Sequence, residues 1–184
     1  LLDLGQLNKT FDIIESSGVL HHMEKPMAGW KVLVSCLKVG GLMKIGLYSE
    51  LARQHIVKMR EEIQQLNTET DHIGMKRFRN GVIRSKAPHH QLIISSPDFH
   101  SMGSLRDLLF HVQEHRFTIP QIQHCLTKLG LKFCGFEVGT ITQDFKRTNS
   151  GEDDAYDLIK WHAYEQAHPH AFAGMYQFWC QKVG

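Results

Sequence analysis

The chain has 184 residues, of which 42% are hydrophobic and 22% charged, and its formal net charge is +2. These values are typical of one globular domain with a sizeable core, and they exclude a disordered chain. No apolar run approaches the roughly 20 residues of a membrane-spanning helix, and the start LLDLGQLNKT lacks a signal-peptide pattern. We therefore expect a cytoplasmic protein without membrane contact.

The first expected elements form a strand, a helix and a second strand. Phe11–Glu15 is a short apolar run, which favours a buried strand. Met27–Leu37 has the apolar spacing of one helix face, and Gly40-Gly41 is expected to end that helix. Leu42–Tyr48 is again apolar. Strand, helix and strand at this spacing predict a βαβ unit with parallel strands.

A mainly helical stretch is expected next. Ser49–Gln65, with Ser49 as the cap, and Thr70–Ser85 are expected to be helices, and Lys86–Gly103 is expected to be a loop. Residues 53–86 contain eight Lys or Arg against four acids. A basic stretch of this strength is usually a solvated helix face, so nucleic-acid contact is not expected. Ser104 is expected to open a further helix, with Asp107 as its capping partner.

The last third of the chain returns to strands. Thr118 and Gln121 form a capping box for a helix that Gly130 ends. Two strands and a helix complete the expected elements: Leu131–Val138, Ala155–Ala167 and Met175–Lys182. The whole pattern predicts an α/β fold with a mixed sheet and an antiparallel pair at one edge. The sheet core is expected in 1–48 and 131–182, and a helical insertion in 49–130.

Two stretches carry a resemblance to a known family, namely FDIIESSGVLHHMEKP and KVGGLMKIGLYSE. They resemble the second half of a class I S-adenosylmethionine-dependent methyltransferase, whose fourth strand reads FDxIxxxxVLHH and is followed by a helix and a (K/R)PGG turn. Phe11-Asp12, Val19–His22 and Lys38–Gly41 match these motifs, with Val39 in place of the proline. Later segments are similar to a bacterial subgroup whose methyltransferase domain often follows tetratricopeptide repeats, so the resemblance covers nearly the whole chain.

The resemblance implies a Rossmann-like fold, S-adenosylmethionine as cofactor and an acceptor that it does not identify. In open α/β sheets, ligands bind at the carboxyl ends of the strands. The stretch after the first strand would then line the cofactor, with Glu15, Ser17, Gly18 and Val19 as the candidate residues.

Further residues are candidates for the acceptor side. His21 and His22 are candidate catalytic bases, because histidine titrates near neutral pH. Packing of His21 and capping by His22 are the alternatives. Tyr48, Phe99 and His100 stand where family members often shape the acceptor pocket, and packing or capping explains them nearly as well.

The family's glycine-rich cofactor loop has no counterpart in this sequence. The resemblance therefore implies the C-terminal half of the domain, with weak or absent cofactor binding by this chain alone. The FDIIE strand would then be an exposed apolar edge, which favours a homodimer. A truncated, non-catalytic domain that dimerises or binds a protein is the alternative function.

Metal chemistry has weaker support. Residues 111–115 (HVQEH) match the inverted zinc-peptidase motif, in which two histidines lie one helical turn apart and Glu137 or Glu165 would be the third ligand. His89-His90 and His168-Pro169-His170 lie in expected loops and could hold adventitious metal. The four cysteines stand singly, so they favour reduced thiols over a zinc ribbon. No metal site is assigned.

Overall fold

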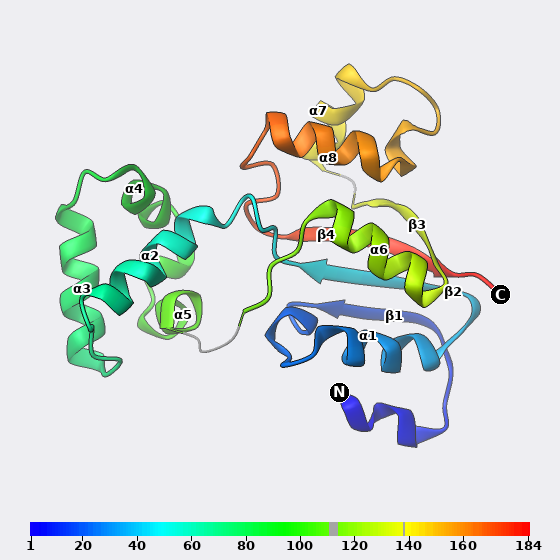
Figure 1. The fold of residues 1–184 in the computed structure, drawn as a ribbon, viewed down its shortest axis with the longest axis horizontal. Coiled ribbons are helices and arrows are strands. Elements are labelled where there is room, and N and C mark those ends of the chain that lie inside the picture. The colour runs from blue at the N-terminus through cyan, green and yellow to red at the C-terminus, as the bar shows by residue number, and fades with distance from the viewer. Residues whose placement is uncertain (111–113, 138) are drawn as a thin grey trace. The chain divides into compact units, whose positions relative to one another are not determined.

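The computed structural model describes residues 1–110, 114–137 and 139–184 (Figure 1). The chain divides into two compact units. The sheet unit comprises Leu1–Ala52 together with Gln113–Gly184, and the helical unit comprises Arg53–Val112. Among the helices of the described residues, none combines the length and the apolar character that crossing a membrane requires.

The sheet unit contains four strands in the order β1-β2-β4-β3. Their bounds are β1 Phe11–Ser17, β2 Leu37–Leu47, β3 Leu131–Phe136 and β4 Tyr176–Lys182. β1 and β2 are parallel, whereas β4 is antiparallel to both β2 and β3. The mixed sheet with an antiparallel pair at one edge is therefore confirmed.

The beginning of β2 differs from the expectation. β2 begins at Leu37 and runs through Gly40-Gly41, which were expected to form a turn. Gly40 has φ +77°, and the pairing with β1 shifts register, from Leu37 opposite Phe11 to Leu42 opposite Ile13. Because glycine accepts this left-handed conformation, the pair acts as an irregularity inside the strand rather than as its boundary.

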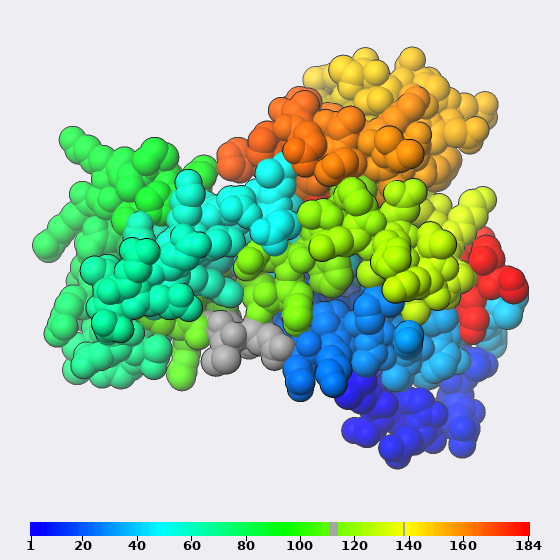
Figure 2. Space-filling view, viewed as in Figure 1, coloured from blue at the N-terminus to red at the C-terminus, as the bar shows by residue number. Residues whose placement is uncertain are grey.

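Helices cover one face of the sheet, which is the face in view in Figures 1 and 2. The helices of this unit are α1 Pro26–Ser35, α6 Ile119–Leu129, α7 Thr140–Thr148 and α8 Leu158–Ala167, with the short 3-10 helices η1 Leu2–Leu7, η2 Leu20–His22 and η5 Asp154–Tyr156. α6 packs against α1, α8 and β3, and its buried side chains belong to the same core as the sheet. It was expected in the helical insertion, but it is part of the sheet unit.

Aromatic side chains fill much of the core under these helices. Trp161 stacks on Phe145 of α7 with ring centroids 3.7 Å apart, and Phe136 packs against the edge of the same indole at 4.9 Å. Tyr176 and Phe178 of β4 are fully buried, whereas Trp179 between them and Cys180 is only half-buried. Successive side chains of a strand point to opposite faces, so Trp179 lies on the face away from this aromatic cluster.

The helical unit has a core of its own. Its elements are α2 Gln54–Gln65, α3 His72–Arg84, α4 Pro88–Ile94, η3 Pro97–Phe99, α5 Met102–Leu105 and the π-helical turn η4 Arg106–Phe110. The buried cluster comprises Ile56, Met59, Ile63, Val82, Ile93, Phe99, Leu105 and Leu109. The expected loop 86–103 thus contains a helix, because Ile93 buries one side of it in this core. Ser101, rather than Ser104, caps α5.

Candidate cofactor and substrate site

The carboxyl ends of β1 and β2 meet at one edge of the sheet. The two strands are parallel, and Ser17 lies opposite Gly46. A Cβ atom at Gly46 would lie 2.3 Å from Ser17 Oγ and 2.8 Å from Met175 Sδ. Glycine at position 46 therefore allows Ser17 to sit against β2, where its hydroxyl contacts Met175 Sδ at 3.3 Å.

The turn after β1 carries the predicted cofactor residues. Gly18 has φ +74°, a conformation that side chains rarely adopt, and a Cβ built there has no atom within 4 Å. The backbone at Gly18 therefore borders open space. Glu15, Ser17 and Val19 are exposed around it. The four predicted residues thus lie on one accessible rim of the sheet.

Two histidines and a tyrosine cluster beyond this turn. His21 is fully buried and stacks on Tyr48, with ring centroids 3.8 Å apart. The rings of His21 and His22 lie edge to face, with their centroids 4.4 Å apart. Both His22 and Tyr48 are only half-buried. The structure therefore brings His21, His22 and Tyr48 together. Because His21 is buried, its position is one of packing, whereas the side chains of His22 and Tyr48 are partly exposed.

Phe99 and His100, the other two predicted acceptor-side residues, lie in the helical unit. Phe99 is fully buried in the core of that unit, which indicates a packing role. His100 is exposed, and its Nε2 lies 3.0 Å from the carbonyl oxygen of Ile94. Both residues therefore have roles within their own unit.

A buried polar network that the sequence did not predict lies in the sheet unit. The carboxylate of Glu165 is 1% exposed and accepts hydrogen bonds from Ser49 Oγ at 2.7 Å and Tyr176 Oη at 2.5 Å. Burial, followed by the hydrogen bond to Glu165, raises the pKa of Tyr176, so the phenol remains a donor. The network joins the residues after β2 to α8 and β4, which fixes the segment that follows Tyr48.

Residues 114–117 form a strap beside the end of β2. The N–H of Phe117 donates to the Tyr48 carbonyl at 2.9 Å, and the N–H of His115 donates to the His21 carbonyl at 2.8 Å. Arg116 pairs with Glu50 at 3.0 Å and lies 3.7 Å from Glu114. The strap therefore holds the backbone at His21 and at Tyr48.

The strap also bears on the zinc-peptidase alternative. Residues 114–116 are not helical, so this part of HVQEH lacks the helical spacing that the motif requires. His111 lies outside the described residues. Glu165, one of the two expected third ligands, is instead held by Ser49 and Tyr176. The expected helix over residues 114–115 and the role of Glu165 as third zinc ligand are therefore wrong.

A cavity of about 490 Å³ adjoins the strap. It lies where the strap meets the first turns of α1 and α6, and it is lined by Pro26, Met27, His115, Arg116, Phe117, Pro120, Gln121, His124 and Cys125. A volume of this size is in the range of small-molecule pockets. The sheet unit therefore has an open pocket next to the strap.

Comparison with known proteins finds relatives in sequence and likenesses in structure. No family model matches the chain. An uncharacterized Synechococcus protein, syc1184_c, is 31% identical in an alignment of 180 positions that covers 89% of this chain and 42% of that protein. PKMT2 from Rickettsia typhi superposes with a TM-score of 0.64, and its complex with AdoHcy with 0.65, each at 14% identity.

These likenesses cover 95% of this chain and 36% of PKMT2. The chain therefore spans less than half the length of the proteins that it matches. At this sequence identity, the structural likeness establishes the fold.

Proposed function

We propose that the chain, which has the fold of an S-adenosylmethionine-dependent methyltransferase, is the acceptor-side half of an enzyme that methylates an acceptor. The observation that carries the proposal is the open rim at the carboxyl end of β1, where the Gly18 backbone borders empty space beside the His22 and Tyr48 surfaces. In a sheet of this kind, that edge is where ligands bind. The AdoHcy complex of the structurally similar PKMT2 supports the same assignment.

The residues at the rim fit part of a cofactor site. Glu15, Ser17, Gly18 and Val19 would contact the methionine and sulfonium side of S-adenosylmethionine. Gly18 allows close approach of the backbone, and Glu15 offers a carboxylate to a cationic group. The remaining contacts of such a site require a glycine-rich loop, which this sequence lacks. We therefore expect weak or absent cofactor binding by these 184 residues alone.

Methyl transfer requires the protein mainly to position the acceptor against the methyl group. Bound S-adenosylmethionine supplies a methyl group activated by its positive sulfur. Residues of this chain have to orient the acceptor in line with that methyl and keep water out. His22 is the accessible candidate for taking the acceptor's proton, and Tyr48 would contact the acceptor. His21, held under Tyr48 by stacking, would position it.

Calorimetric titration of S-adenosylhomocysteine into the full-length product of the gene tests the proposal. We expect micromolar binding, and Gly18→Val should weaken it by about tenfold or more, which corresponds to about 1.4 kcal/mol. Gly40→Val is the matched control, because Gly40 has φ +77° and equally open surroundings but lies near the start of β2. Equal effects of the two substitutions would contradict the placement of the cofactor.

A second function fits another feature of the same unit. β1 is the terminal strand of the described sheet, and its Phe11 and Ile13 side chains are 42% and 59% exposed. An exposed apolar edge favours pairing with another chain, as in a non-catalytic dimerising or protein-binding module. Absence of S-adenosylhomocysteine binding by the full-length protein would select this alternative.

A further inference from the structure

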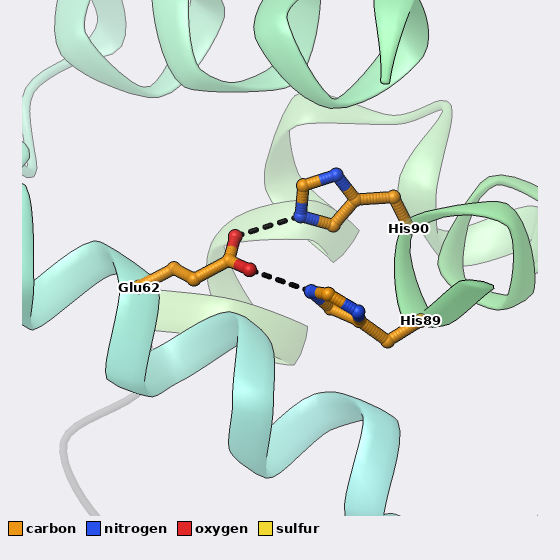
Figure 3. A group of neighbouring side chains, drawn as sticks. All are labelled: Glu62, His89 and His90. Carbon is orange, nitrogen blue, oxygen red and sulfur yellow. Dashed lines mark hydrogen bonds and ion pairs between the residues drawn. The ribbon is translucent and has the colours of Figure 1, made fainter. Parts of the chain in front are cut away.

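Two consecutive histidines and a glutamate converge inside the helical unit (Figure 3). His89 and His90 lie in the first turn of α4, and Glu62 lies on α2, which packs against it. His89 Nε2 is 2.6 Å from one carboxylate oxygen of Glu62, and His90 Nε2 is 2.7 Å from the other. The three ligand atoms lie within 4.8 Å of one another. These histidines were expected in a solvated loop, but they are part of a built cluster.

We propose that Glu62, His89 and His90 bind one divalent transition-metal ion, with zinc as the ion that the donors suit best. Imidazole nitrogen is a preferred ligand for zinc, copper and nickel, whereas magnesium and calcium prefer oxygen. Two histidines and one glutamate form a donor set that zinc uses with an open fourth position. Within the described residues, this is a group of three whose ligand atoms lie within 4.8 Å of one another.

The surroundings of the cluster suit a bound ion. The His89, His90 and Glu62 side chains are 20%, 13% and 31% exposed, so an ion there would be shielded but reachable. Each imidazole Nε2 lies within hydrogen-bonding distance of a Glu62 oxygen, so zinc would replace the proton in each of these contacts.

A cavity of about 480 Å³ adjoins the cluster. Glu62 and His90 line it, together with residues of α3 that include Gly74, Phe78 and Gly81. An ion held by those two ligands would therefore lie at the cavity wall. Its fourth position could then hold water or a small ligand, which distinguishes this site from a closed structural zinc site.

Zinc titration of the full-length, EDTA-treated protein, read out by calorimetry against a competing chelator, tests the proposal. We expect one saturable equivalent of zinc. Loss of one protein ligand should weaken binding by at least about 100-fold, because removing even an outer-shell partner costs 10 to 100-fold. The test variants are Glu62→Gln, His89→Gln and His90→Gln. His72→Gln, at an exposed histidine of α3, is the control and should bind normally.

Two results of the zinc titration would contradict the proposed site. Absence of saturable binding, or equal binding by the three variants and the control, would show that the cluster is only a pair of hydrogen bonds between α2 and α4. The site does not depend on the methyltransferase assignment, so either proposal can fail without the other.

A measurement on the unaltered protein covers the case in which the variants do not fold. Nitrogen-15 spectra of the histidine side chains, recorded during zinc addition, should shift for two imidazoles at one equivalent and leave the other signals in place. Assignment of the two shifted rings to His89 and His90 would support the site. Shifts spread over many histidines, including those of His168 and His170, would contradict it.

Discussion

Tyr176 and Glu165 form a contact whose strength depends on burial. Among the described residues, the Tyr176 hydroxyl is one of two side-chain donors to the Glu165 carboxylate, which is 1% exposed. Tyr176→Phe removes that donor and leaves the buried charge with fewer partners, so we expect a loss of about 1–3 kcal/mol in the free energy of unfolding. Urea unfolding followed by circular dichroism measures it.

The matched control for Tyr176→Phe is Tyr156→Phe, because the Tyr156 side chain is 56% exposed in the same unit. We expect this change to remain within about 0.5 kcal/mol of the parent protein, as is usual for surface positions. Equal losses in the two variants would mean that the Tyr176 hydroxyl does not stabilise the carboxylate of Glu165.

The candidate site shows which residues a sequence can identify. Ser17, Gly18, His21 and His22 are adjacent in the chain, so a motif could group them. Glu165 could not be grouped with Ser49, because 116 positions separate them and only the packing of α8 brings them together. The same holds for Glu62 and His89, which are 27 positions apart on two packed helices.

Two glycines of α3 show how packing decides the effect of one substitution. A Cβ at Gly74 would lie 2.3 Å from the backbone oxygen of Glu69, whereas a Cβ at Gly81 has no atom within 4 Å. Gly81→Ala should raise the free energy of unfolding by about 0.5–1 kcal/mol, since alanine favours the helix. Gly74→Ala should lower it by about 1–3 kcal/mol through overpacking.

Thermal unfolding of the two single variants beside the parent protein measures both effects. Each variant serves as the control for the other, because both place the same residue in the same helix. A gain in stability from Gly74→Ala would show that the Glu69 backbone moves freely, and it would contradict the packing described here.

At the scale of elements, local signals predicted best. The Thr118–Gln121 capping box and the Gly130 end of α6 are confirmed, with Gly130 at φ +63°. α7 was not predicted, because its buried side is narrow and rests chiefly on Phe145. The helix α4 was also missed, since its Ile93 becomes apolar core only when α2 packs against it. Where tertiary contacts decide an element, the sequence pattern is too weak to predict it.

At the scale of the whole molecule, the chain consists of two units with separate cores. The expected insertion of residues 49–130 corresponds to a shorter helical unit, Arg53–Val112. The hydrophobic pattern predicted helices in both regions, but it could not distinguish α6, which packs on the sheet, from the helices that pack on each other. The division between the units follows from which core each helix joins.

The uncovered strand β1 leads to the last prediction. Ile13 lies on this terminal strand of the described sheet with 59% of its surface exposed. We propose that two copies of the 184-residue chain pair along β1, because backbone groups at a sheet edge are free to bond another strand. Sedimentation analysis over a range of concentrations should then show a monomer–dimer equilibrium, which Ile13→Lys shifts toward monomer through burial of a charge.

Ile159→Lys is the control for that substitution, since Ile159 lies on α8 and is 70% exposed. It adds the same charge and removes a similar apolar area, so a general effect of surface hydrophobicity would appear in both variants. If only Ile13→Lys dissociates the dimer, the contact lies on β1. A parent chain that stays monomeric at high concentration would contradict pairing, because an apolar edge of this kind would then be tolerated in water without a partner.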